Sequence, residues 1–200
     1  IKTDIIYTNM NEPLGKYAGL RCEILESIAC LNGNGPNDLM EIVLHLGSKI
    51  LLQSKIAKNS QIAIDLMLES IENKSAINKF EEIIISQGGD IDELIGDGIV
   101  KHNAIIIKAK NSGYIRSIKT DMIGWALVEI GAGRKQKSDK LDYFAGIEFL
   151  NKVGDKVNKG DSIFRIFGND IERLKKAKKI LKNTYSLVDR EVGKSKLILD

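Results

Sequence analysis

The feature of this chain that most constrains its fold is a change of pattern near the middle of its 200 residues. Up to about residue 90, apolar residues recur every three or four positions, which is the spacing of amphipathic helices. From residue 104 onward, short apolar runs are separated by glycine-bearing turns, which is typical of strands. We therefore expect an α/β (α+β) fold with two domains, residues 1–100 and residues 101–200.

The first domain is expected to contain one strand, a glycine-bearing loop and four helices. Ile5, Ile6 and Tyr7 favour a strand over Lys2–Thr8. Capping and turn residues place the helices at positions 20–31, 36–54, 61–73 and 76–87. The apolar stripe of the second helix predicts a core face made of Leu39, Ile42, Val43, Leu46 and Ile50.

The second domain is expected to combine short strands with two helices. The strands are predicted at positions 104–109, 113–118, 146–150 and 162–167, with a further strand possible in the tail at 191–199. The helices are predicted at positions 122–130 and 171–183, and the second of them is basic. This basic helix lacks interleaved aromatic residues, so we interpret it as a solvated face.

Composition indicates no particular partner and no membrane span. Thirty Lys and Arg against 27 Asp and Glu give a net charge of +3, which is too small to indicate nucleic acid or an acidic membrane as a partner. No apolar run approaches the roughly 18 residues of a membrane span, and no signal peptide is recognisable, so we expect a cytoplasmic protein. Cys22 and Cys30 lie about 12 Å apart along one predicted helix, too far for a disulfide.

A loop with the sequence TNMNEPLGKYAG, residues 8–19, separates the predicted first strand from the first helix. Pro13, Gly15 and Gly19 allow the backbone to turn sharply and to approach another group closely. The residues alone leave open whether the loop binds something or is only a turn before a helix.

The motifs of both halves together resemble one enzyme family. The first half contains NMNEPLGKYAGLRCEILES and LNGNGP, and the second contains GYIRSIKTDMIGWALVEIGAGRKQKSDKLDYFAGIEFLNKVGDKVNKGDSIFRI. In this order they resemble the C-terminal half of the pyrimidine-nucleoside and thymidine phosphorylases. The resemblance implies the C-terminal part of a large mixed-sheet α/β domain that binds phosphate, followed by a half-barrel (barrel-sandwich-like) α+β domain.

The same resemblance implies reversible phosphorolysis of a pyrimidine nucleoside to free base and (deoxy)ribose 1-phosphate, with inorganic phosphate as co-substrate. The family's Lys-His-Ser-Thr-Gly-Gly phosphate motif and its base-binding Arg, Ser and Lys motif are not found in these 200 residues. We therefore expect no catalytic residue here and no activity from this chain alone. A homodimer formed through an N-terminal helical domain is also implied.

The resemblance further implies a monovalent cation, K+ or Na+, bound beside the phosphate loop. Matching the motif by position assigns its ligands to the main-chain carbonyls of Leu14 and Tyr17 and to the carboxylate of Glu26. Several neutral oxygens and one carboxylate suit a hard, weakly charged ion. Without the resemblance, Glu26 is better interpreted as a solvated helix residue.

A second motif is Gly131-Ala132-Gly133-Arg134, with Asp139 and Asp142 behind it. In the resembled family this loop lies near the interdomain cleft, so we expect it to help domain closure, with Arg134 best able to touch an anion. A helix cap followed by a solvated turn is the alternative.

Two other functions remain open at this stage. The stretch at positions 152–161 resembles the half-barrel turn of biotinyl and lipoyl carrier domains, although it lacks their modified-lysine tetrapeptide. A free-standing binding or carrier module built from residue 104 onward is therefore one alternative. The other is a nucleotide (AMP-type) phosphorylase, which has related motifs and a different substrate.

Overall fold

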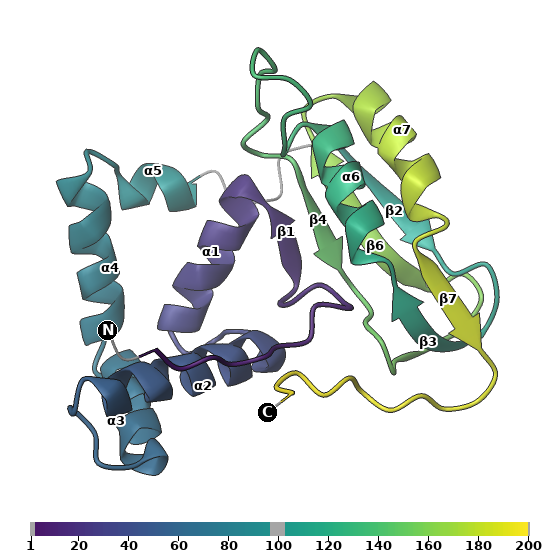
Figure 1. The fold of residues 1–200 in the computed structure, drawn as a ribbon. Helices are drawn as coiled ribbons and strands as arrows, with labels where there is room; N and C mark the ends of the chain where they lie inside the picture. Colours follow the sequence, from purple (N-terminus) through teal and green to yellow (C-terminus); the bar gives the residue numbers. More distant parts are fainter. Residues whose placement is uncertain (1–2, 97–102, 200) are drawn as a thin grey trace. The chain divides into compact units, whose positions relative to one another are not determined.

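The structure is a computed structural model that describes residues 3–96 and 103–199 (Figure 1). Helices and two antiparallel sheets that do not close into a barrel confirm the expected α/β (α+β) class. The chain forms two compact units. Residues 3–8, 25–96 and 197–199 make up the first, which we call the helical unit, and residues 9–24 and 103–196 make up the second, which we call the sheet unit. The expected domain boundary after residue 100 lies outside the described residues.

Four of the helices lie where the sequence predicts them. They are α1 (Leu20–Leu31), α2 (Asn37–Gln53), α3 (Ser60–Glu72) and α4 (Ser75–Ser86), and a short helix that was not predicted, α5 (Ile91–Gly96), follows them. The start of α3 shows how a capping residue makes a helix predictable. Asn59 Oδ1 accepts a hydrogen bond of 2.9 Å from the main-chain N–H of Ile62 and so caps the helix. In the helical unit, α2 packs against α3, and α3 packs against α4.

The strand predicted at Lys2–Thr8 is wrong over its described residues. Only an isolated bridge forms there, between Thr8 and Ile198, next to a hydrogen bond of 2.9 Å from Leu199 N–H to the Tyr7 carbonyl. The strand considered for the tail at 191–199 is limited to the same bridge. Without a sheet to join, two β-forming segments make one contact and no ladder.

The predicted core face of α2 is also wrong in large part. Ile42 is buried, whereas the side chains of Val43, Leu46 and Ile50 are 42%, 39% and 64% exposed. Helix α3 approaches α2 beside Gly47, where an added Cβ would lie 2.3 Å from the Met67 methyl carbon. Within the helical unit this contact leaves the apolar stripe of α2 exposed.

The sheet unit contains two antiparallel sheets (Figure 1). The larger has the order β1-β4-β6-β2 and consists of β1 (Tyr17–Gly19), β4 (Gly146–Phe149), β6 (Ser162–Gly168) and β2 (Asn103–Lys108). The smaller has the order β5-β3-β7 and consists of β5 (Lys156–Val157), β3 (Gly113–Ile118) and β7 (Tyr185–Val188). Strands β2, β3, β4 and β6 were predicted, whereas β1, β5 and β7 were not.

Two helices of the sheet unit, α6 (Thr120–Ile130) and α7 (Ile171–Leu181), lie side by side, and α7 also packs on β2 and β6 (Figure 1). Between helices and strands is the main hydrophobic core, in which Phe164, Ile166 and Leu174 are fully buried. Strand β6 is covered on both faces, because five of its seven residues, including neighbouring ones, are buried. In the described part of the chain, no helix is long and apolar enough to cross a bilayer.

Candidate functional site

The loop that carries the predicted cation ligands Leu14 and Tyr17 is held against the connection between β4 and β5. Lys152 Nζ donates a hydrogen bond of 2.9 Å to the Pro13 carbonyl, and Val153 N–H donates one of 3.1 Å to Glu12 Oε2. Phe149 N–H donates to the Lys16 carbonyl at 2.7 Å. These contacts span more than half of the chain, so the loop belongs to the sheet unit although it precedes α1.

Two glycines of this loop have conformations that other residues rarely adopt. Gly15 is buried with φ of 72°, which follows directly from the turn after Pro13. Gly19 has φ of 148°, and a Cβ there would lie 2.6 Å from the Ala145 carbonyl oxygen. Both features agree with the sequence argument that this backbone turns sharply and makes close approaches.

The main-chain carbonyl of Tyr17 has a defined direction. In an antiparallel ladder, hydrogen-bonded pairs alternate with pairs whose main-chain groups point away from each other. Because Lys16 and Phe149 form a hydrogen-bonded pair, Tyr17 opposite Glu148 is a pair of the second kind. The Tyr17 carbonyl therefore points away from β4, toward the outer edge of the sheet, where β1 is the edge strand.

The side chain of Tyr17 also forms a contact between strands, which the sequence argument did not predict. Its hydroxyl donates a hydrogen bond of 3.1 Å to Glu148 Oε1, and Glu148 Oε2 accepts one of 2.8 Å from Arg165 Nη1. The chain Tyr17–Glu148–Arg165 therefore links β1, β4 and β6 through side chains, in addition to their main-chain pairing.

The third predicted ligand, Glu26, lies on α1 in the helical unit, so the structure does not determine its separation from Leu14 and Tyr17. Leu14 is exposed, whereas Glu26 is only 7% exposed. A carboxylate at that depth is normally paired or bound to a cation. Its negative charge also acts locally: the pKa of the Cys30 thiol is raised mainly by burial and further by Glu26.

The donor set fits a monovalent cation in its chemistry. The sheet unit has two neutral main-chain oxygens, one of them directed out of the sheet edge, and the helical unit separately has one buried carboxylate; these are the donor types that such an ion takes. Among residues 3–96 and 103–199, no group of three or more His, Cys, Asp or Glu could hold a metal ion.

The predicted closure loop begins at the C-terminal cap of α6. Gly131 has φ of 97°, and Ala132 N–H donates back to the Leu127 carbonyl at 3.0 Å, which is the pattern of a Schellman cap. A Cβ on Gly131 would lie 2.7 Å from Arg173 Nη1. The positive φ therefore favours glycine at this position, and any side chain would also displace the guanidinium of Arg173.

The body of the closure loop is held by two acidic residues. Asp139 Oδ2 accepts hydrogen bonds from Lys135 N–H at 2.8 Å and Gln136 N–H at 3.0 Å, and these lower the pKa of Asp139. The ammonium of Lys135 lies 2.6 Å from Glu129 Oε2 and lowers the pKa of Glu129. Arg134 is exposed and has no hydrogen-bond or ionic partner among the residues that the structure describes.

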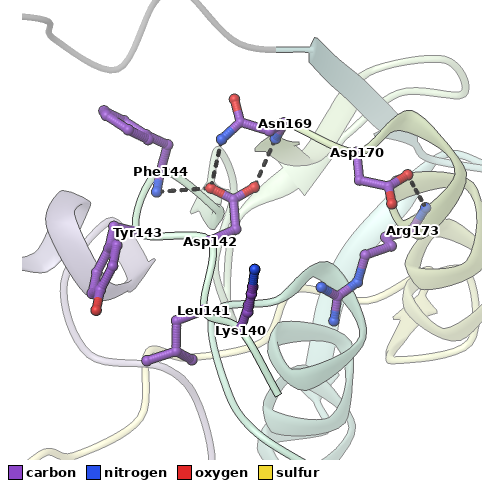
Figure 2. A pocket seen from close by; sticks show the side chains of 8 residues that line it. All are labelled: Lys140, Leu141, Asp142, Tyr143, Phe144, Asn169, Asp170 and Arg173. Atoms are coloured by element: carbon purple, nitrogen blue, oxygen red, sulfur yellow. Dashed lines mark hydrogen bonds between the residues drawn. The ribbon is translucent and has the colours of Figure 1, made fainter. Parts of the chain in front are cut away.

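The base of the loop is a polar cluster that the sequence argument identified only in part (Figure 2). Asp142 accepts hydrogen bonds from Phe144 N–H at 3.1 Å, Asn169 N–H at 2.7 Å and Asn169 Nδ2 at 2.9 Å. Arg173 donates from Nε to the Glu129 carbonyl at 2.7 Å. Asp142 was noted from the motif, whereas Asn169 and Arg173 were missed; only their place at the start of α7 could have suggested them.

A surface hollow of about 340 Å³ lies over this cluster (Figure 2). It is lined by Lys140, Leu141, Asp142, Tyr143, Phe144, Asn169, Asp170 and Arg173. The acceptor and donor groups of Asp142 and Arg173 are used in holding the loop to α6 and α7. These hydrogen bonds therefore hold the two ends of the predicted closure loop, and Arg134 within it is exposed.

Comparison with known proteins shows what these residues are similar to. Residues 114–188 match the family model described as "Pyrimidine nucleoside phosphorylase C-terminal domain". Among curated relatives, a "Pyrimidine-nucleoside phosphorylase" of Staphylococcus aureus strain RF122 is 37% identical over 175 residues, covering 84% of this chain and 39% of that protein. Proteins of the same name from Staphylococcus haemolyticus and Staphylococcus epidermidis are each 38% identical, covering 84% and 85% of this chain.

Residues 114–188, which lie within the sheet unit, therefore resemble the C-terminal domain of a nucleoside phosphorylase. More narrowly, residues 114–188 belong to the pyrimidine nucleoside phosphorylase C-terminal domain family, and the chain as a whole is similar to pyrimidine-nucleoside phosphorylases. The resemblance expected from the motifs is thus confirmed. The chain spans about two fifths of the length of these relatives, 39% in the first case.

Proposed function

We propose that the protein to which these residues belong catalyses the reversible phosphorolysis of a pyrimidine nucleoside. The observation that carries this proposal is the similarity to curated pyrimidine-nucleoside phosphorylases over 84% of the chain, together with the match of residues 114–188 to the C-terminal domain model. Phosphate would attack the anomeric carbon of the (deoxy)ribose, and the pyrimidine would leave with the electron pair of the glycosidic bond. A homodimer and a cytoplasmic location are part of the same proposal.

In this reaction the residues described here would organise the site, and phosphate and base would be bound by residues outside positions 1–200. Holding two reactants in line and stabilising the charge of the departing base lower the barrier. Residues 1–100 would complete the phosphate-binding domain. Gly131, Ala132, Gly133 and Arg134 would form the loop that closes over the substrate, with Arg134 facing an anion.

The proposed cation ligands are the carbonyls of Leu14 and Tyr17 and the carboxylate of Glu26. A bound K+ or Na+ would supply positive charge beside the phosphate site. The direction of the Tyr17 carbonyl and the burial of Glu26 support this assignment. The role of the protein groups is to present oxygens at fixed positions, so that the loop next to phosphate keeps one conformation.

Activity is tested by incubating the full-length protein with uridine or thymidine and inorganic phosphate, and by measuring the free base. We expect base release by the full-length protein and none by residues 1–200 alone. Release by residues 1–200 alone would show that the catalytic groups are wrongly assigned. Absence of release by the full-length protein with both nucleosides would refute the proposed reaction.

The cation ligand Glu26 is tested by the substitution Glu26→Ala in the full-length protein, with Glu41→Ala as the matched control, because Glu41 is an exposed glutamate of α2. Loss of a carboxylate ligand should raise the KCl concentration for half-maximal activity by about tenfold or more and should raise the KM for phosphate. The control should leave both unchanged. If Glu26→Ala behaves like the control, Glu26 is not a ligand.

A further inference from the structure

The connection between β4 and β5 is a rigid part of the sheet unit. Gly154 N–H donates to the Ile115 carbonyl at 2.9 Å, and Ile115 N–H donates to the Asp155 carbonyl at 3.0 Å, so the turn is joined to β3. Asp155 Oδ2 accepts from Lys152 N–H at 2.8 Å, which closes the turn on itself. Val153 within it is buried. Groups that this turn presents therefore have fixed positions relative to the two sheets.

Two groups of this connection form hydrogen bonds to the loop before the proposed cation ligand Leu14. The ammonium of Lys152 is bonded to the Pro13 carbonyl, the peptide group immediately before Leu14, and Val153 N–H is bonded to the Glu12 carboxylate. On the other side, the Lys16 carbonyl is bonded to Phe149 N–H. The carbonyls on both sides of residues 14–15, those of Pro13 and Lys16, are thus held by hydrogen bonds. These bonds limit the directions that the carbonyls of residues 14 and 15 can take.

We propose that Lys152 is a positioning residue for the cation site: by holding the Pro13 peptide it sets the direction of the Leu14 carbonyl and so raises the affinity for K+. This inference rests on the proposed cation site. The positive charge of Lys152 by itself would repel a cation. Positioning and repulsion therefore predict opposite changes in K+ affinity when the ammonium is removed, and the sign of the change distinguishes them.

The test uses Lys152→Met in the full-length protein, which keeps the apolar stem and removes the donor and the charge. K+ binding is read from the increase in Tm with KCl, compared with choline chloride at equal ionic strength, so the readout does not depend on activity. We expect the half-saturating KCl concentration to rise by about tenfold, the effect of losing one charge-assisted hydrogen bond. Any general loss of stability appears in choline chloride and is subtracted.

Lys159→Met is the matched control. Lys159 is an exposed lysine in the next connection, between β5 and β6, and within the described residues its side chain has no hydrogen-bond or ionic partner. It should leave the K+ response unchanged. Lys152→Arg, which keeps a cationic donor, should restore part of the affinity lost in Lys152→Met.

Each other outcome has a definite meaning. A lower half-saturating KCl concentration in Lys152→Met would show that repulsion dominates, and an unchanged one would show that the contact is irrelevant; both overturn the positioning role while leaving the cation site in place. If the unsubstituted protein is stabilised equally by KCl and choline chloride, the cation site itself fails, and the inference fails with it.

Discussion

Gly131 shows how a single residue decides the path of the closure loop. Its positive φ ends α6, and the missing side chain leaves room for the guanidinium of Arg173, whose Nη1 lies 2.7 Å from the position a Cβ would take. The same α6 contains a second glycine, Gly124, for which neither reason applies, because an added Cβ would meet nothing within 4 Å.

The two glycines therefore predict opposite effects of alanine. Gly131→Ala should lower the free energy of unfolding by about 1–3 kcal/mol, because it combines backbone strain with a steric clash against Arg173. Gly124→Ala should be neutral or should raise it by up to about 1 kcal/mol, since alanine is the better helix former. Urea denaturation of the chain and its two variants measures both values, and equal effects would refute the assigned role of Gly131.

At the scale of elements, α6 and α7 are joined by one side chain. Arg173, in the first turn of α7, donates from Nε and Nη2 to the carbonyls of Glu129 and Val128 at the end of α6. Helix ends leave their last carbonyls without intrahelical partners and carry partial negative charge, so a cation is well placed there. The two carbonyls lie just before Gly131, where the predicted closure loop begins.

Removing the donors of Arg173 should therefore weaken the pairing of the two helices. We expect Arg173→Met to lower the free energy of unfolding by about 1–3 kcal/mol, because partly buried carbonyls lose charge-assisted hydrogen bonds while the stem is kept. Lys179→Met, an exposed position of the same helix, should change it by less than about 0.5 kcal/mol. Circular dichroism during urea unfolding gives both values, and equal values would contradict the argument.

The predictability of these elements from sequence follows how local their causes are. The helices were found because caps such as Asn59 and apolar periodicity lie within a few residues of each other. Strand β1 was missed because its residues, Tyr17–Gly19, look like part of a glycine-rich loop and become a strand only by pairing with β4. The segment at 3–8 failed for the opposite reason: it has β-forming residues and no sheet to join.

Only those residues of the candidate site that lie within a sequence motif could be proposed from the sequence. The motifs identified Leu14, Tyr17, Glu26 and the loop at 131–134 through a resemblance, and no periodicity or spacing would have done so. The residues that hold these segments, Lys152 and Arg173, had no local signal, because their partners lie 139 and 44 positions away in the chain.

At the scale of the whole molecule, apolar burial is unevenly distributed. The large core cluster lies in the sheet unit, where β6 has five buried residues. In the helical unit α4 has none, and Ile83 and Ile85 on it are exposed. Since burial of apolar surface is the main source of stability, the two units should differ in how easily they open.

Hydrogen exchange of the 200-residue chain measures this difference. Main-chain amides of β6 should exchange more slowly than those in the middle of α4, on the order of a hundredfold or more after correction for intrinsic rates. The comparison uses hydrogen-bonded amides of regular elements only, so exposure of loops does not affect it. Equal protection of α4 and β6 would show that the chain opens as one cooperative unit.

The pairing of β1 with β4 also has a consequence for biosynthesis. Tyr17 meets Glu148 across 131 positions of the chain, and closing so long a loop is entropically costly before other contacts exist. On the ribosome, β1 has no partner until β4 has been synthesised and has emerged. The turn that carries Leu14 should therefore acquire its final shape late, after the C-terminal domain that holds it has begun to fold.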